Sequence, residues 1–83
     1  MNKIFIKLYV PIIEESYDVW IPVNRKVYDV IYLLIKAVNE MSRGNYRPLE
    51  LPFLYDKLTT EKYNLELMIK DTEIRNGSEL ILI

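Results

Sequence analysis

The chain has 83 residues, hydrophobic residues make up 51% of it, and 11 Lys and Arg against 12 Asp and Glu give a formal net charge of −1. This length suits a single domain over residues 1–83, and the apolar content is too high for a disordered chain. Because Cys and His are absent, thiol and imidazole catalysis, disulfides and Cys- or His-based metal sites are excluded. Only carboxylate, Lys or Tyr chemistry remains, and since the sequence also has no phosphate-binding glycine loop, we expect no enzymatic activity and no cofactor. The balanced charge argues against a nucleic-acid partner.

The first part of the chain alternates between apolar and other side chains, which is typical of half-buried strands. In residues 3–10 one face is aliphatic, and Pro11 ends the run because proline cannot donate a hydrogen bond to a sheet. A second alternating run at residues 17–21 follows a short polar break, and the two runs together predict a hairpin.

Hydrophobic residues then recur at helical spacing from Val27 to Met41. We expect one amphipathic helix here, with Asn24 as its N-cap and Gly44 as its C-terminal stop. Its apolar arc is broad, which indicates that a sheet covers it.

The last part of the chain is divided by turn residues into short segments. Asn76 and Gly77 mark a tight turn of the Asn-Gly type. The expected segments are a loop at 45–52, a strand at 53–55, a turn at 56–61, a possible short strand at 63–67, a turn or helical turn at 69–74, the tight turn at 75–78 and a strand at 79–83.

This order of elements predicts an α+β fold, because one amphipathic helix needs all the strands as a single sheet beneath it. The first and last strands alternate most strongly and are expected at the centre of the sheet. The result is the β-grasp arrangement, a mixed sheet of four to five strands with one main helix packed on one face.

Two parts of the chain carry a resemblance to known proteins. The opening KIFIK with the hairpin and helix after it, and the stretch from Ile69 to Leu82, resemble ubiquitin. Residues 17–22 with the start of the helix, and residues 74–78 with the last strand, are similar to the YukD/EsaB family of bacterial ubiquitin-like proteins. The resemblance implies an association with type VII (WXG100) secretion and a protein partner from that system.

Conjugated ubiquitins and sulfur carriers end in a flexible tail with two adjacent glycines. Here the sequence stops at Ile83, inside the expected last strand, and its two glycines, Gly44 and Gly77, are both expected in turns. We therefore expect a non-conjugating protein that binds non-covalently. No segment has the features of a signal peptide or of a transmembrane helix, so we expect a cytoplasmic protein without membrane insertion.

The sheet face opposite the helix is expected to carry large apolar side chains, although such a face is normally polar. This makes it a candidate protein-binding surface, because exposed apolar patches mark interaction sites. The alternative is that single exposed apolar residues are common and only pack over neighbouring strands. The candidate residues are Phe5, Tyr9, Trp20, Leu54, Ile81 and Ile83.

Two functions are consistent with these features. The first is an accessory or regulatory component of a type VII secretion system that docks through this face. The alternative is a self-assembling structural or scaffold module unrelated to secretion, for example a homodimer formed through the same face or through an edge strand.

Overall fold

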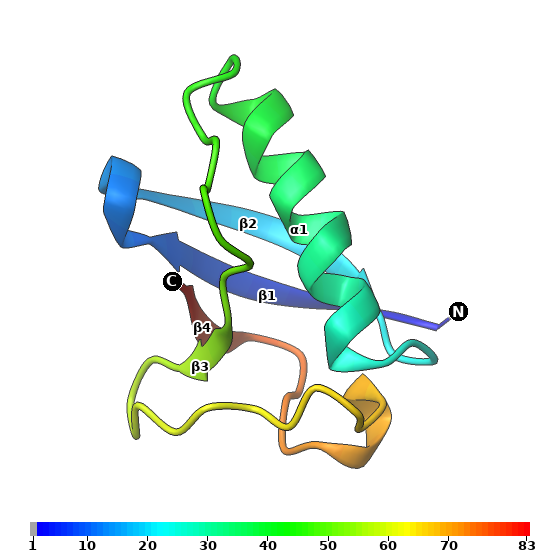
Figure 1. Cartoon of the computed structure of the whole chain (residues 1–83). Helices are drawn as coiled ribbons and strands as arrows, with labels where there is room; N and C mark the ends of the chain where they lie inside the picture. Colours follow the sequence, from blue (N-terminus) through cyan, green and yellow to red (C-terminus); the bar gives the residue numbers. More distant parts are fainter. Residues whose placement is uncertain (1) are drawn as a thin grey trace.

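The structure is a computed structural model that describes residues 2–83, and it consists of one mixed sheet covered by one long helix. Figure 1 shows the helix lying across one face of the sheet, with the N-terminal hairpin behind it. The strands are β1 (Lys3–Val10), β2 (Glu15–Pro22), β3 (Leu54–Asp56) and β4 (Ser78–Leu82), and the helix is α1 (Val27–Met41).

The strand order in the sheet is β2-β1-β4-β3. β1 pairs antiparallel with β2 and parallel with β4, and β3 pairs antiparallel with β4. The first and last strands therefore occupy the centre, and the predicted β-grasp arrangement is confirmed. No helix within residues 2–83 combines the length and the apolar character needed to cross a bilayer.

The hairpin between β1 and β2 turns through a one-turn 3₁₀ helix at Pro11–Ile13. Glu14 then adopts a left-handed conformation, with φ of 53°, and β2 starts directly after it. Ile13 packs against the core, whereas Ile12 is 74% exposed. The predicted hairpin is confirmed, and β2 is longer than the predicted strand at 17–21.

The N-terminus of α1 differs from the prediction. Lys26, not Asn24, occupies the N-cap position, and no side chain caps the helix. Two N–H groups of the first turn, which have no partner within the helix, instead donate to distant backbone carbonyls. Val27 donates to Leu67 at 2.8 Å and Tyr28 donates to Leu65 at 3.1 Å. A side-chain cap is therefore not needed, because tertiary contacts satisfy these donors.

The helix α1 ends shortly before the predicted stop at Gly44, because Ser42 is the C-cap and Arg43, with φ of 56°, is the first left-handed residue after it. Gly44 has a φ of +83° and its N–H donates to the Asn39 carbonyl at 2.8 Å. Glycine takes up this left-handed conformation without strain, and such a residue commonly ends a helix.

The segment 63–67 does not form the predicted strand. Its carbonyls at Leu65 and Leu67 cap α1, and the Tyr63 N–H donates to the Leu54 carbonyl at 2.9 Å, beside an isolated bridge between Tyr55 and Lys62. The expected helical turn is present at Ile69–Asp71, and the tight turn before β4 is closed by the Ser78 N–H on the Arg75 carbonyl at 2.9 Å.

The core lies between α1 and the covered face of the sheet, which we call the inner face. Leu54 is fully buried there, because it pairs with Leu82 and so shares the inner face with it. Its predicted place on the opposite face is wrong. The other buried aliphatic residues are Ile6, Leu8, Val10, Val19, Ile21, Val27, Val30, Ile31, Leu34, Val38, Ile69, Ile74, Leu80 and Leu82.

Candidate functional site

The candidate site is the sheet face opposite α1, which we call the outer face. Side chains alternate between the faces of a strand, so the strand register determines its members. Lys3, Phe5, Lys7 and Tyr9 of β1 lie opposite Pro22, Trp20, Asp18 and Ser16 of β2. β4 adds Glu79 and Ile81, β3 adds Tyr55, and Phe53 and Ile83 continue the pairing through two mutual backbone hydrogen bonds.

One end of the outer face carries an aromatic pair. The rings of Phe5 and Trp20 meet edge to face, with centroids 5.6 Å apart and an interplanar angle of 61°. Trp20 is 63% exposed, and Phe5 is partly buried. The backbone beneath is fixed on its other side, because Phe5 donates to Asn76 Oδ1 at 2.8 Å and accepts from the Gly77 N–H at 2.6 Å. Trp20 thus projects from a rigid base.

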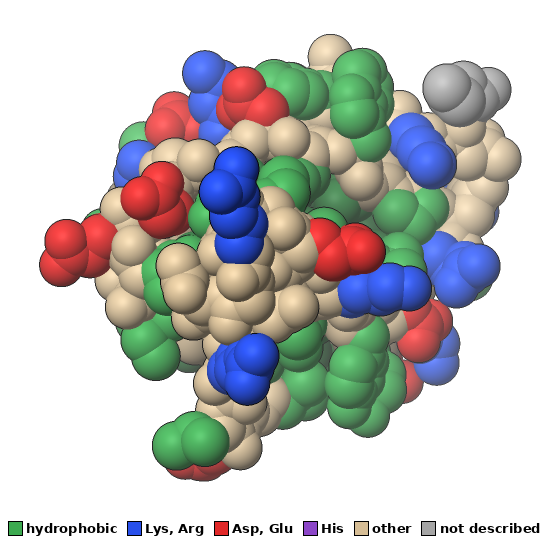
Figure 2. Space-filling model, turned by 90° about the horizontal axis from the view of Figure 1, so that it is seen from above, with side chains coloured by type: hydrophobic (Ala, Val, Ile, Leu, Met, Phe, Trp, Pro, Cys, Tyr) green, Lys and Arg blue, Asp and Glu red, His purple; other side chains and the backbone are tan. Residues whose placement is uncertain are grey.

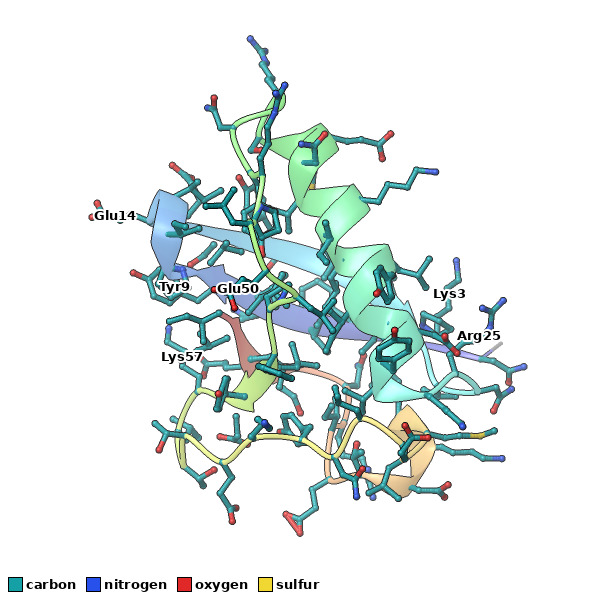
Figure 3. The ribbon with its side chains drawn as sticks, in the orientation of Figure 1. Lys3, Tyr9, Glu14, Arg25, Glu50 and Lys57 are labelled. Atoms are coloured by element: carbon teal, nitrogen blue, oxygen red, sulfur yellow. The ribbon has the colours of Figure 1, made fainter. Side chains whose placement is uncertain are left out.

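The other end carries a second group of apolar residues around Tyr9, which we call the Tyr9 cluster. Ile81 lies opposite both Tyr9 and Tyr55 in the register. Lys57 Nζ lies 5.4 Å from the centre of the Tyr9 ring, and Figure 3 shows these two side chains together at one end of the sheet. The members of the Tyr9 cluster are Tyr9, Phe53, Tyr55, Ile81 and Ile83.

A row of charges separates the aromatic pair from the Tyr9 cluster. Asp18, Lys7 and Glu79 are neighbours on adjacent strands, and Lys57 extends the row with an ion pair to Glu79 at 3.8 Å. Lys7 and Asp18 form no ion pair within residues 2–83. A hollow of about 170 Å³ opens beside the row, lined by Lys7, Leu8, Tyr9, Ser16, Asp18, Lys57 and Glu79.

Beside β3, outside the outer face, lies a small hydrogen-bond network. The Tyr63 hydroxyl donates to Asp56 Oδ2 at 3.1 Å, and the other carboxylate oxygen accepts the Leu58 and Thr59 N–H groups. The bond from Thr59 is the main cause that lowers the pKa of Asp56, and burial is the main cause that raises the pKa of Tyr63. These groups hold the turn after β3.

This arrangement suits protein binding. Trp and Tyr are favoured as anchors at interfaces, and a mixture of apolar and charged groups gives a partner both contact area and orientation. In the described part of the chain, no group of three or more carboxylates is placed to hold a metal ion. Figure 2 views the molecule from above and not onto the outer face, and in that view too both signs of charge are interleaved with hydrophobic side chains.

Five of the six candidate residues lie together on the outer face. Trp20 and Ile83 are exposed, Phe5, Tyr9 and Ile81 are partly buried, and Leu54 lies in the core. Sequence reasoning missed Tyr55 and Phe53 on this face. Their position follows from pairing Tyr55 with Ile81, because a shift of one residue in a short strand exchanges its two faces.

Known proteins resemble this chain in structure and not in sequence. No family model and no curated protein matches the sequence. The structure is similar over its whole length to a chain of the MycP5-free ESX-5 inner membrane complex, with a TM-score of 0.82 and 16% identity, and it spans 21% of that chain.

Two isolated domains are matched over most of their length. One is the EccD5 ubiquitin-like domain from Mycobacterium xenopi, with a TM-score of 0.82, 18% identity and coverage of 100% of this chain and 94% of that one. The other is the ubiquitin-like domain of the type VII secretion protein ECCD1 from Mycobacterium tuberculosis. Its TM-score is 0.79 and its sequence identity 12%, and the match covers 100% of this chain and 99% of that one. The chain therefore has the ubiquitin-like fold.

Proposed function

We propose that this chain is a non-conjugating ubiquitin-like protein that binds a protein partner non-covalently through its outer face. The observation that carries the proposal is the aromatic pair, in which Trp20 is 63% exposed on a sheet that holds its backbone in place. An exposed tryptophan on a rigid base loses little conformational freedom on binding, so most of its contact area contributes to affinity.

The row of charges favours a specific protein partner and not merely nonspecific hydrophobic contact. Lys7 and Asp18 lack ion-pair partners within residues 2–83, so both are free to meet groups of opposite charge. Such complementary charges fix the orientation of a partner, while the aromatic pair and the Tyr9 cluster supply apolar contacts on either side.

We further propose that the partner belongs to a type VII secretion system and that the protein is a cytoplasmic accessory or regulatory component of it. Two observations support this: the YukD/EsaB-like segments at 17–22 and 74–78, and the likeness of fold to the EccD ubiquitin-like domains. A fold alone hosts many functions, so the gene neighbourhood is informative here. Genes for a WXG100 protein and a membrane ATPase of the secretion type next to this one would support the proposal.

A binding role rather than an enzymatic one agrees with the side chains present, since the sequence has neither Cys nor His.

The direct test is capture of partners from a lysate that contains the secretion components, with the chain immobilised. Trp20→Ala removes the exposed anchor, and Ile81→Asp places a charge in the Tyr9 cluster. We expect both variants to recover at least about tenfold less secretion component than the parent, because both contacts lie in the proposed interface.

The matched control is Leu67→Ala, which shortens a side chain that is 40% exposed and lies outside the outer face. It should recover the partner as well as the parent does. If Trp20→Ala and Ile81→Asp are folded and still recover the partner fully, the outer face is not the binding site. If the captured protein has no link to secretion, binding through this face stands and the pathway assignment fails.

A further inference from the structure

The exposed face of α1 is more apolar than the solvent-facing side of a helix usually is. Tyr28, Tyr32 and Leu33 are 40%, 50% and 45% exposed. The Tyr28 and Tyr32 rings meet edge to face at 5.2 Å, and their hydroxyl groups are 3.2 Å apart. The helix α1 lies on the inner face of the sheet (Figure 1), so its solvent-exposed side is separate from the outer face.

Exposed charges flank these residues on the same side of α1. Asp29 and Lys36 lie about two turns apart, on either side of Tyr32 and Leu33, with Glu40 one turn further on. None of the three forms an ion pair within the described residues. Arg25, exposed beside the start of the helix (Figure 3), is also without one.

The charge pattern along α1 is self-complementary when two copies of the helix run in opposite directions. When two α1 helices lie antiparallel, with a two-fold axis between residues 32 and 33, Asp29 of each copy lies level with Lys36 of the other. Glu40 of each copy then faces the start of the other copy's α1, which Arg25 precedes by two residues. At the centre, the two Tyr32 side chains meet on one side of the axis and the two Leu33 side chains meet on the other. Asp29 and Lys36 thereby gain opposite charges in two symmetric pairs, and Glu40 lies at the end of the interface nearest Arg25.

We propose that the exposed face of α1 is an isologous interface with a second copy of this chain. A closed two-fold dimer requires a surface that is complementary to itself, and the pattern Asp29, Tyr32, Leu33, Lys36 satisfies that requirement. Aromatic residues at the centre with charges towards the rim are the usual composition of an interface. One helix pair is a small contact, so the dimer is weak and depends on concentration.

Because α1 covers the inner face, this dimer leaves both outer faces free and directed away from each other. The dimer is therefore bivalent towards any protein that the outer face binds, and linked sites raise the apparent affinity for a partner that is itself multivalent. The interface uses no residue of the outer face, so it stands or falls independently of the proposed function.

The test is a charge exchange followed by sedimentation equilibrium over about 10 μM to about 1 mM chain, a range that detects weak association. Asp29→Lys alone sets two lysines against each other across each half of the interface, and Lys36→Asp alone sets two aspartates against each other. We expect each single variant to raise the dissociation constant about tenfold or more. The double variant restores the opposite charges and should restore dimerisation.

Two further variants keep the test decisive. Tyr32→Ala should weaken the dimer without reversing a charge, whereas Trp20→Ala, on the outer face, should leave dimerisation unchanged. Circular dichroism confirms that each variant keeps its helix. The proposal is overturned if the parent is monomeric over the whole range. It is also overturned if folded single variants dimerise like the parent, if the folded double variant does not recover, or if Trp20→Ala abolishes the dimer.

Discussion

The two faces of β1 differ in chemistry although they belong to the same eight residues. On the inner face, Ile6, Leu8 and Val10 are aliphatic and fully buried, whereas on the outer face Phe5, Lys7 and Tyr9 mix rings with a charge and keep part of their surface in water. Aliphatic side chains pack a core to high density, while rings with polar neighbours suit a surface that meets a partner. Under the proposed function, one face of the strand thus serves stability and the other serves partner binding.

The largest expected difference in stability is between variants of two neighbouring residues in β4 that point to opposite faces. Leu80 is fully buried opposite Leu8, and Glu79 lies on the outer face opposite Lys7. Leu80→Ala should lower the free energy of unfolding by about 3 kcal/mol, since it removes buried methyl groups and leaves a cavity. Glu79→Ala should change it by about 0.5 kcal/mol or less, because its ion pair is exposed. Urea denaturation of both variants measures this difference, and equal losses would show that the two faces do not differ as described.

The next effect concerns the turn before β4. This turn sets the register of β4 and so determines which of its side chains lie on each face of the sheet. Gly77 has a φ of +90°, and a Cβ placed there would meet no atom within 4 Å. Gly77→Ala should therefore cost about 1 kcal/mol from backbone strain alone. Gly77→Asn should cost less, because asparagine tolerates the left-handed region better. Thermal unfolding of both variants checks the order, and a fully stable Gly77→Ala protein would contradict it.

A smaller loss of stability is expected when the exposed anchor is removed. Trp20→Ala eliminates the ring contact with Phe5, at 5.6 Å, and should lower the free energy of unfolding by about 1 kcal/mol or less. Trp20→Phe should retain most of that contact. Chemical denaturation measures both values. A loss as large as that of Leu80→Ala would mean that Trp20 belongs to the core and not to the recognition surface.

The smallest effect is a pH dependence at the end of β3, where Asp56 begins the turn. The pKa of Asp56 is lowered in the folded chain, mainly by the hydrogen bond from the Thr59 N–H. The ionised form is thus favoured by folding, and this stabilisation is present above the unfolded pKa of about 4 and lost as the pH falls through the lower folded pKa. As the pH falls below about 4, the Asp56→Asn variant should lose slightly less stability than the parent. Identical acid profiles for both proteins would show that the carboxylate does not stabilise this turn.

The parts of the fold that could be predicted are those that local patterns determine. Alternation set the faces of β1, β2 and β4, helical spacing placed α1, and Gly44 and Gly77 marked turns that the structure contains. Leu54 was placed on the wrong face because a strand of three residues has too few positions for alternation to fix its sides. Only the pairing with Leu82 does so, and that contact is distant in sequence.

The same limit explains two other differences. The N-cap at Asn24 and the strand at 63–67 were inferred from neighbouring residues, but the first turn of α1 is capped by carbonyls of Leu65 and Leu67, about forty residues away. The apolar surface was expected on the outer face. Part of the exposed apolar surface lies instead on α1, at Tyr28, Tyr32 and Leu33.

The most direct test of the central claim uses the single tryptophan of the chain, Trp20, as a reporter of the outer face. Protein labelled with 5-fluorotryptophan gives one fluorine resonance, which is followed by NMR while the captured partner, itself unlabelled, is added to saturation. Recognition through the outer face predicts that this resonance shifts or broadens progressively until all the chain is bound. A resonance that stays unchanged when the partner has bound completely would contradict it.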